Sequence, residues 1–270
     1  GKSQQMDSVI AKYTNRLKKI RVTYKESSLQ CLIYFLSSRV AAITSHSVAG
    51  EVEEIEIFDD GMEEGTRYGR SEFTLHSKPG REVTYVTFSR EISSVKSIIR
   101  NLRKRSEAKE SYRNVIRLKR SDKGSCSISQ RLPAAKSISP RGLWYYTEKQ
   151  GKHVRNVNEY YCTENTGLSY GDCSLPYLES IGTDLRLIGI HFGGINDMAF
   201  LAPVYADDVP EVESIDFETS ISEKQYADVI NSHSVIPGLN YVATLKTALR
   251  QVTKNNFELS PLATTKYELE

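Results

Sequence analysis

The sequence is poor in cysteine and in the clusters that hold metals. Its 270 residues include four cysteines, with no Cys-x-x-Cys pair and no group of histidine and cysteine at the spacing of metal ligands. A disulfide scaffold and a zinc site are therefore not indicated. We expect no metal and no cofactor.

Long apolar runs and a strong net charge are also missing. No run is long enough to span a bilayer, and the first residues lack the pattern of a secretory signal. The formal net charge of +2 does not by itself require a nucleic-acid or membrane partner. These absences favour a soluble protein of a reducing compartment that does not contact a membrane.

Hydrophobic patterning predicts a mostly β protein that begins with a helix. Apolar residues at helical spacing predict an amphipathic helix over residues 6–20. Alternating and β-branched segments then predict strands, of which residues 82–88 are the clearest. The other predicted strands are residues 20–24, 30–35, 39–43, 51–58, 71–75, 142–147, 159–162, 187–192 and 199–204.

A cysteine stands in a tight polar turn, Gly171-Asp172-Cys173-Ser174. Such a turn exposes the sulfur, and it lets the surrounding backbone N–H groups converge on a point where an oxyanion can form. Gly171 would allow the preceding peptide units to tilt without a clash from a Cβ atom. We therefore predict Cys173 as a nucleophile, with the N–H groups of Gly171, Asp172 and Cys173 as an oxyanion hole.

The predicted strand that follows contains a histidine, in the run Ile188-Gly189-Ile190-His191-Phe192-Gly193-Gly194. A Gly-x-Cys turn joined to a Gly-x-His strand resembles the nucleophile region of the picornavirus 3C and 3C-like cysteine proteases. The family has glycine where this chain has Ser174. The resemblance implies a chymotrypsin-like fold of two six-stranded antiparallel β-barrels, with an N-terminal helix and a C-terminal extension of mixed or irregular structure.

The resemblance also implies a general base, and His46 is the candidate. It follows a predicted strand, as the base histidine of the family does, although an isolated histidine here would more often lie in a surface loop. The unperturbed pKa of histidine, about 6.5, allows it to take a proton from a thiol at neutral pH. His46 would thus activate Cys173.

A carboxylate should orient the histidine, and Glu82 matches the family pattern of an acid at the start of a strand. An ionised Glu82 would accept a hydrogen bond from the ring and stabilise the imidazolium. A solvated glutamate at a strand end is the alternative interpretation. Three other acids in neighbouring turns stay open as candidates, namely Asp59, Asp60 and Glu72.

The resemblance implies a substrate site around His191. In the family, the strand histidine and a threonine before the cysteine bind the side chain of a P1 glutamine; Thr166 is the candidate threonine, and Ser169 could replace it. A neutral His191 can donate to the oxygen of Gln or Glu. Gly193 and Gly194 would leave room for the substrate backbone to pair with the strand. The implied partner is a viral polyprotein cut after Gln or Glu in the host cytoplasm.

Basic residues concentrate between residues 100 and 123, which the resemblance places between the barrels. Family members bind RNA there through Phe-Arg-Asp-Ile, but this chain has Val95-Lys96-Ser97-Ile98 instead. A dense basic run gives salt-dependent affinity for phosphate, and a solvated face is an equal alternative. The candidate RNA-binding residues are Arg100, Arg103, Lys104 and Arg105.

Four regions are predicted along the chain: a helix and first barrel over 1–95, a basic connector over 96–125, a second barrel with the nucleophile over 126–206, and an extension over 207–270. The leading function is a cysteine endopeptidase. The alternative is a β-barrel RNA-binding or scaffolding protein in which Cys173 is structural and buried. A serine hydrolase that uses Ser169 or Ser174 lacks the Gly-x-Ser-x-Gly turn.

Overall fold

The computed structural model describes residues 2–120, 126–137, 143–147, 153–164, 168, 171–195 and 197–212. The chain divides into two units, Gly1–Pro210 and Glu211–Glu270. The predicted extension over 207–270 thus lies almost wholly outside the described residues. No helix in the described ranges is long and apolar enough to cross a bilayer.

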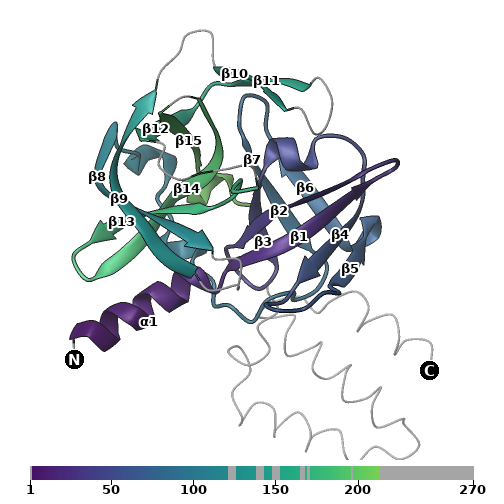
Figure 1. Ribbon diagram of the computed structural model, residues 1–270, viewed down its shortest axis with the longest axis horizontal. Coiled ribbons are helices and arrows are strands. Elements are labelled where there is room, and N and C mark those ends of the chain that lie inside the picture. The colour runs from purple at the N-terminus through teal and green to yellow at the C-terminus, as the bar shows by residue number, and fades with distance from the viewer. Residues whose placement is uncertain are drawn as a thin grey trace, which may run out of the picture. The chain divides into compact units, whose positions relative to one another are not determined.

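The first sheet is antiparallel and has seven strands in the order β5-β4-β1-β2-β3-β7-β6 (Figure 1). Ile20 and Val22 on one strand, and Ile33 and Phe35 on the next, are fully buried because residues two apart share a face of the sheet. Six strands were predicted; the seventh forms because Thr66–Gly69 turns back to pair with β4. The strands are β1 (Leu17–Tyr24), β2 (Ser28–Phe35), β3 (Val40–Thr44), β4 (Val52–Phe58), β5 (Thr66–Gly69), β6 (Phe73–Ser77) and β7 (Val83–Phe88).

The second sheet is a closed six-stranded antiparallel barrel in the order β12-β15-β14-β13-β8-β9, beside a separate hairpin of β10 and β11. The expectation of a mostly β protein with two antiparallel sheets is confirmed. The strands are β8 (Ser111–Arg120), β9 (Cys126–Ser137), β10 (Leu143–Thr147), β11 (His153–Val157), β12 (Tyr160–Glu164), β13 (Pro176–Ile181), β14 (Asp184–Ile195) and β15 (Met198–Pro203).

Strand β8 lies within residues 96–125, which the sequence assigned to a connector. It pairs with β9 and β13, so the barrel begins at Ser111. The reason is that buried apolar side chains, Tyr112, Val115 and Leu118, are interspersed among the basic ones.

The short 3-10 helices are η1 (Ser45–Val48), η2 (Arg70–Glu72), η3 (Ile99–Asn101), η4 (Arg105–Glu107) and η6 (Ala206–Asp208).

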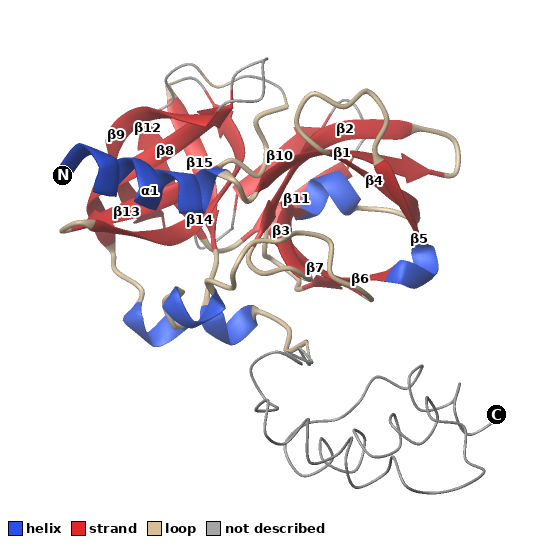
Figure 2. Ribbon diagram, turned by 90° about the horizontal axis from the view of Figure 1, so that it is seen from below, coloured by secondary structure: helices blue, strands red, loops and turns tan. Residues whose placement is uncertain are grey.

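The N-terminal helix α1 spans Lys2–Thr14 and does not continue to residue 20 as predicted. Residues from Leu17 onward pair with β2 instead, and this pairing overrides the helical spacing. The buried guanidinium of Arg16 fixes the change of direction by donating to the carbonyls of Phe35, Leu36 and Lys96. Figures 1 and 2 show α1 beside the second barrel, where the Tyr13 hydroxyl donates to the Leu185 carbonyl at 2.5 Å.

Strand β14 approaches β15 so closely at Gly189 that a side chain does not fit. A Cβ atom at this position would lie 2.1 Å from the backbone oxygen of Ala202, whereas one at Gly69 would meet nothing closer than 4.0 Å. We expect Gly189→Ala to lower the free energy of unfolding by about 1–3 kcal/mol, the usual cost of overpacking, and Gly69→Ala to change it little. Denaturant titration of the full chain measures both. Equal stability of the two variants would contradict the close approach.

Candidate active site

The first sheet brings His46 and Glu82 together. His46 lies in η1 directly after β3, and Glu82 directly precedes β7, the strand that pairs with β3. One carboxylate oxygen of Glu82, Oε1, accepts from the backbone N–H of His46 at 2.6 Å and lies 2.9 Å from its ring Nδ1. Glu82 is completely buried and His46 is 8% exposed. This geometry directs Nδ1–H to Glu82 and leaves Nε2 for a reacting group.

The other candidate acids lie elsewhere. Asp59 pairs with Lys18, Glu72 pairs with Arg90, and Asp60 is exposed. Of the acids considered from the sequence, Glu82 is therefore the one that the fold places against the His46 ring.

Short hydroxyl side chains hold the histidine loop in place. The Ser45 hydroxyl lies 2.8 Å from that of Thr84, and the backbone N–H of Ser45 donates to the Glu82 carbonyl at 3.0 Å. The hydroxyls of Thr44 and Ser47 lie 2.6 Å apart. These contacts fix both the histidine and its acid before any substrate arrives.

The second barrel supplies the cysteine turn. Gly171 has a φ of +95° and Ser174 a φ of +78°, and the Leu175 N–H donates to the Asp172 carbonyl at 3.2 Å, which closes the turn. Cys173 is a free, partly exposed thiol whose sulfur lies 3.8 Å from the Phe192 carbonyl oxygen. The three residues proposed for an oxyanion hole therefore share this turn.

The two sheets meet at Ser174. Its hydroxyl accepts a hydrogen bond from the backbone N–H of Thr44 at 3.1 Å, and its own N–H donates to the His191 carbonyl at 2.7 Å. Ser174 is fully buried and is the only non-glycine residue with positive φ in the described ranges. Ser174, which follows Cys173, is thus hydrogen-bonded to Thr44, which precedes His46 by two residues.

The charge on His46 follows from its neighbours. Burial alone would lower the pKa of His46, but the hydrogen bonds and charges of Cys173 and Glu82 outweigh it and raise the pKa to about 9. The contact with Cys173 comes first among these favourable causes. His46 therefore keeps its added proton at neutral pH.

His191 lies on β14 beside the cysteine turn, and its pKa is shifted in the opposite direction to that of His46. It is 5% exposed, and its Nδ1 lies 3.2 Å from the hydroxyl of Tyr177 on β13. Burial, then the positive charges of Arg117 and His46, lower the pKa of His191 to about 3. The ring is therefore neutral at ordinary pH.

Sequence reasoning missed Tyr177 and Arg117. The guanidinium of Arg117 is buried beside Tyr177, although this residue belongs to the basic run that we expected between the barrels. The available signal was the alternation of Arg117 and Lys119 with the apolar Ile116 and Leu118, which is typical of a strand.

Of the other predicted substrate residues, the structure describes Gly193 and Gly194 but not Thr166 and Ser169. Gly193 and Gly194 pair with Phe200 and Ala199 of β15, whereas the pairing of β13 with β14 ends at Ile190 in the described ranges. At His191 the cysteine turn takes the place of β13, because the His191 N–H donates to the Leu175 carbonyl at 2.8 Å and the His191 carbonyl accepts from the Ser174 N–H at 2.7 Å. Thr166 and Ser169 lie outside the described residues.

Two of the four predicted RNA-binding residues are engaged inside the protein. Arg103 is 5% exposed and forms an ion pair with Glu179, and Arg105 forms ion pairs with Glu159 and Asp208. The prediction that Arg103 contacts RNA is therefore wrong, and Arg105 is largely committed to its carboxylates. Arg100 and Lys104 are exposed, and RNA binding stays a prediction for them.

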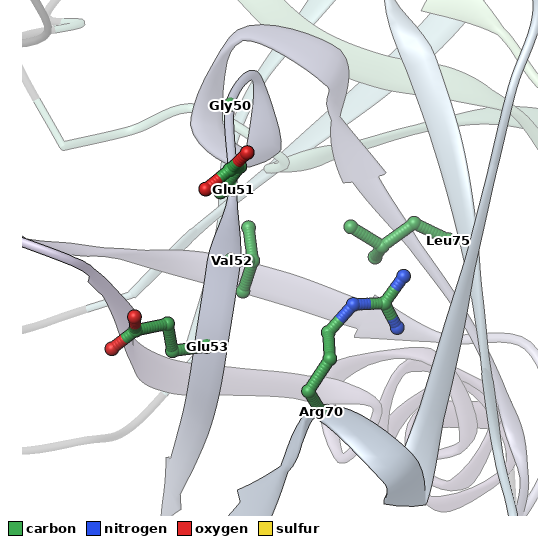
Figure 3. Close-up of a pocket in the computed structure, with 6 residues that line it drawn as sticks. All are labelled: Gly50, Glu51, Val52, Glu53, Arg70 and Leu75. Atoms are coloured by element: carbon green, nitrogen blue, oxygen red, sulfur yellow. The ribbon is translucent and has the colours of Figure 1, made fainter.

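A pocket of about 420 Å³ lies past the histidine loop, where β4 begins. In Figure 3, Val52, Leu75 and the Arg70 guanidinium point towards one another, and Glu53 points away. The pocket does not contain His46, Cys173 or His191, so it is separate from the candidate active site.

Within the described part of the chain, no cluster of three or more His, Cys, Asp or Glu could hold a metal.

Comparison with known proteins shows the fold. No protein-family model and no curated protein matches the sequence. The Rv3671c protease of M. tuberculosis, in its active form, is 14% identical with a TM-score of 0.50, over 79% of this chain and 88% of that one. The tobacco etch virus protease, in complex with product, is 10% identical with a TM-score of 0.53, over 78% of this chain and 86% of that one.

The 3C protein of HRV-C, in complex with rupintrivir, is 10% identical with a TM-score of 0.48, over 74% of this chain and 98% of that one. The chain has the double β-barrel fold of the chymotrypsin-like proteases.

Proposed function

We propose that the protein is a cysteine endopeptidase with Cys173 as nucleophile, His46 as proton carrier and Glu82 as the acid that orients it. The observation that supports this most is the line of contacts from the Glu82 carboxylate through the His46 ring to the Cys173 sulfur. Ser174 is a poor rival nucleophile because its hydroxyl is buried and bonded to the Thr44 N–H. The arrangement is that of a nucleophile, a base and an orienting group.

The reaction would be acyl transfer in two steps. The Cys173 thiolate attacks the scissile carbonyl to form a C–S bond, and backbone N–H groups of the cysteine turn bind the oxyanion. The C–N bond then breaks, and the His46 imidazolium gives its proton to the leaving amine. Water next attacks the thioester and loses a proton to His46, which releases the acid and restores the thiolate.

The substrate would be a peptide bond that follows Gln or Glu, as the resemblance to the 3C proteases implies. A buried neutral His191 supports this assignment because it can donate one hydrogen bond to either side chain. A viral polyprotein in the host cytoplasm remains the expected setting.

The rival function, an RNA-binding or scaffolding barrel, requires an inert Cys173. Against it stand the partial exposure of this thiol, its contact with His46, and the burial of Arg103. A thiol beside a histidine that carries charge is reactive rather than structural. No observation on the described residues specifically favours the rival.

The first test compares wild type with Cys173→Ala on fluorogenic peptides that differ only at P1. Because the thiol forms the covalent bond, we expect kcat/KM to fall by about 1000-fold or more in the variant. Cys162→Ala, which removes a cysteine outside the Cys173 turn, should retain activity. If the folded wild type cleaves no peptide and iodoacetamide fails to modify Cys173, the proposal is wrong.

A second test concerns the pH range. Because the pKa of His46 is raised, its proton is present at neutral pH and is lost as the pH rises through about 9, so activity should fall there. Glu82→Gln removes one of the charges that raise this pKa, and we expect the alkaline limb of kcat/KM to move down by about one pH unit or more. Glu72→Gln is the matched control and should keep the wild-type profile. An alkaline limb that does not move in Glu82→Gln would show that Glu82 does not act on His46.

A third test concerns the bond between the sheets. Ser174→Ala leaves the buried Thr44 N–H without its acceptor, which should cost about 1–3 kcal/mol of stability. Ser174→Gly loses the same acceptor but relieves the left-handed backbone, by about 1 kcal/mol. We expect a similar drop in kcat for both variants, about 10-fold or more, with the glycine variant the more stable. Wild-type kcat in either variant would refute a positioning role.

A further inference from the structure

The turn between β6 and β7 leads directly into the candidate acid, Glu82. The residue before it is Arg81, which is 9% exposed. The Glu82 carboxylate contacts the His46 ring, whereas the Arg81 side chain contacts residues from Glu159 onward. Two neighbouring side chains therefore reach different parts of the fold.

Three oxygen atoms surround the Arg81 guanidinium. Nη2 donates to the carbonyl of Pro203, the last residue of β15, at 3.2 Å. Nη1 lies 3.3 Å from Oε2 of Glu159, which directly precedes β12, and 3.0 Å from Oδ2 of Asp208, the last residue of η6. The guanidinium thus ties the β6–β7 turn to the two ends of the pair β12 and β15 and to the segment that follows them.

A second arginine binds the same two carboxylates. Arg105 of η4 contacts Oε2 of Glu159 through Nη1 and Oδ2 of Asp208 through Nη2, so two cations and two anions alternate in a closed ring. Burial alone would raise the pKa of both carboxyls, but the neighbouring cations outweigh it and lower both pKa values. Both acids are therefore ionised at neutral pH. We call Arg81, Arg105, Glu159 and Asp208 the ionic clamp.

Backbone hydrogen bonds connect Arg81 to the histidine loop. The Arg81 carbonyl accepts from the Ser45 hydroxyl at 3.3 Å, and the Ser45 N–H donates to the Glu82 carbonyl at 3.0 Å. Ser45 directly precedes His46. The peptide between Arg81 and Glu82 is thus held from the clamp on one side and from the histidine loop on the other. A movement of the turn would therefore move the Glu82 carboxylate relative to the His46 ring.

We propose that Arg81 is a positioning residue, which anchors the β6–β7 turn on Glu159 and Asp208 and so holds the Glu82 carboxylate against the His46 ring. The proposal rests on the proposed function, because Glu82 and His46 are the acid and the proton carrier of that enzyme. Arg81 acts through Glu82, since its own guanidinium faces the clamp. The consequence is that the segment after the last strand, as far as Asp208, contributes to the active site.

Loss of the anchor and loss of a positive charge have opposite effects on His46. A positive charge close to the ring disfavours its protonation, so removal of the Arg81 charge alone would leave the pKa of His46 unchanged or raise it. The groups that raise this pKa are Cys173 and Glu82. Displacement of the Glu82 carboxylate would therefore lower it. The direction of the change distinguishes a positioning residue from a charge that acts at a distance.

The test measures peptide cleavage against pH in the full chain, for Arg81→Met and Asp208→Asn. For Arg81→Met we expect kcat to fall by about 10-fold with KM changed by less than about 3-fold, because Glu82 acts on proton transfer rather than on substrate binding. The alkaline limb of kcat/KM should move to lower pH. Asp208→Asn leaves Glu159 as a partner and should shift the limb in the same direction by less. Arg81→Lys, which keeps the charge and a donor, should restore part of the lost kcat.

A double variant tests whether Asp208 acts through Arg81. If it does, Arg81→Met combined with Asp208→Asn should have about the same kcat as Arg81→Met alone, because residues in one network are not additive. Two independent losses that multiply would overturn the anchoring role of Asp208.

Arg90→Met is the matched control. Arg90 follows the other end of β7 and forms an exposed ion pair with Glu72 at 3.4 Å. It should keep the wild-type kcat and pH profile. An alkaline limb that stays at the wild-type pH, or moves up, in folded Arg81→Met and Asp208→Asn would overturn the proposal, because a merely structural ion pair would change stability without lowering the pKa of His46.

A measurement without substrate separates this proposal from the protease function. Histidine labelled with 15N, assigned with His46→Gln, reports the pKa of His46 directly. We expect a value of about 9 in wild type and a lower one in Arg81→Met and Asp208→Asn. If the wild type cleaves no peptide, the protease function is wrong, while the labelled spectra still decide the role of Arg81. If Arg81→Met does not fold, Arg81→Lys and Asp208→Asn, which keep a cation at residue 81, decide it by the same shift.

Discussion

The candidate active site depends on one hydrogen bond between the two sheets, from the Thr44 N–H to the Ser174 hydroxyl. Neither sheet holds a complete set of groups: the first carries His46 and Glu82, and the second carries the cysteine turn. Ser174 accepts a left-handed backbone conformation that costs about 1 kcal/mol for a residue with a Cβ atom. Glycine would avoid this cost but could not accept the bond. Serine at this position therefore gives the junction an acceptor that a glycine lacks.

The two histidines near the cysteine show how neighbours outweigh burial. Both rings are buried, which alone lowers the pKa of each. The Glu82 carboxylate and Cys173 reverse the effect at His46, whereas the Arg117 guanidinium reinforces it at His191. One ring thus carries a proton at neutral pH and the other stays uncharged. Groups whose environments drive their pKa values apart are suited to different chemical roles.

Local patterns predicted ten of the strands, because alternation and turn residues act over a few residues, but not β5, β8, β9, β11 or β13. His46 and Glu82 were singled out by the resemblance to the 3C-like proteases, at the ends of two of the predicted strands. What local patterns could not predict depends on partners that are distant in sequence. Leu17 leaves the helical pattern because β2 offers it a strand partner. The contact of Tyr177 with His191 depends on the register of β13 against β14. Side chains that act on a candidate group from a neighbouring strand are therefore harder to find from one sequence than the candidate groups themselves.

The basic run between residues 100 and 120 shows that the sequence alone does not tell which arginines are paired within the protein. In the sequence its arginines are equivalent, and a dense positive run indicates phosphate binding. In the fold, Arg103 forms an ion pair with Glu179, and Arg105 forms ion pairs with Glu159 and Asp208. Arg117 is hydrogen-bonded to the Tyr177 hydroxyl. Burying a guanidinium is costly unless it is paired and hydrogen-bonded, so each of these partners matters to the stability of the second barrel. These three arginines of the basic run therefore contribute to the structure of the second barrel, and a loss of function on changing them would first reflect a loss of these internal contacts.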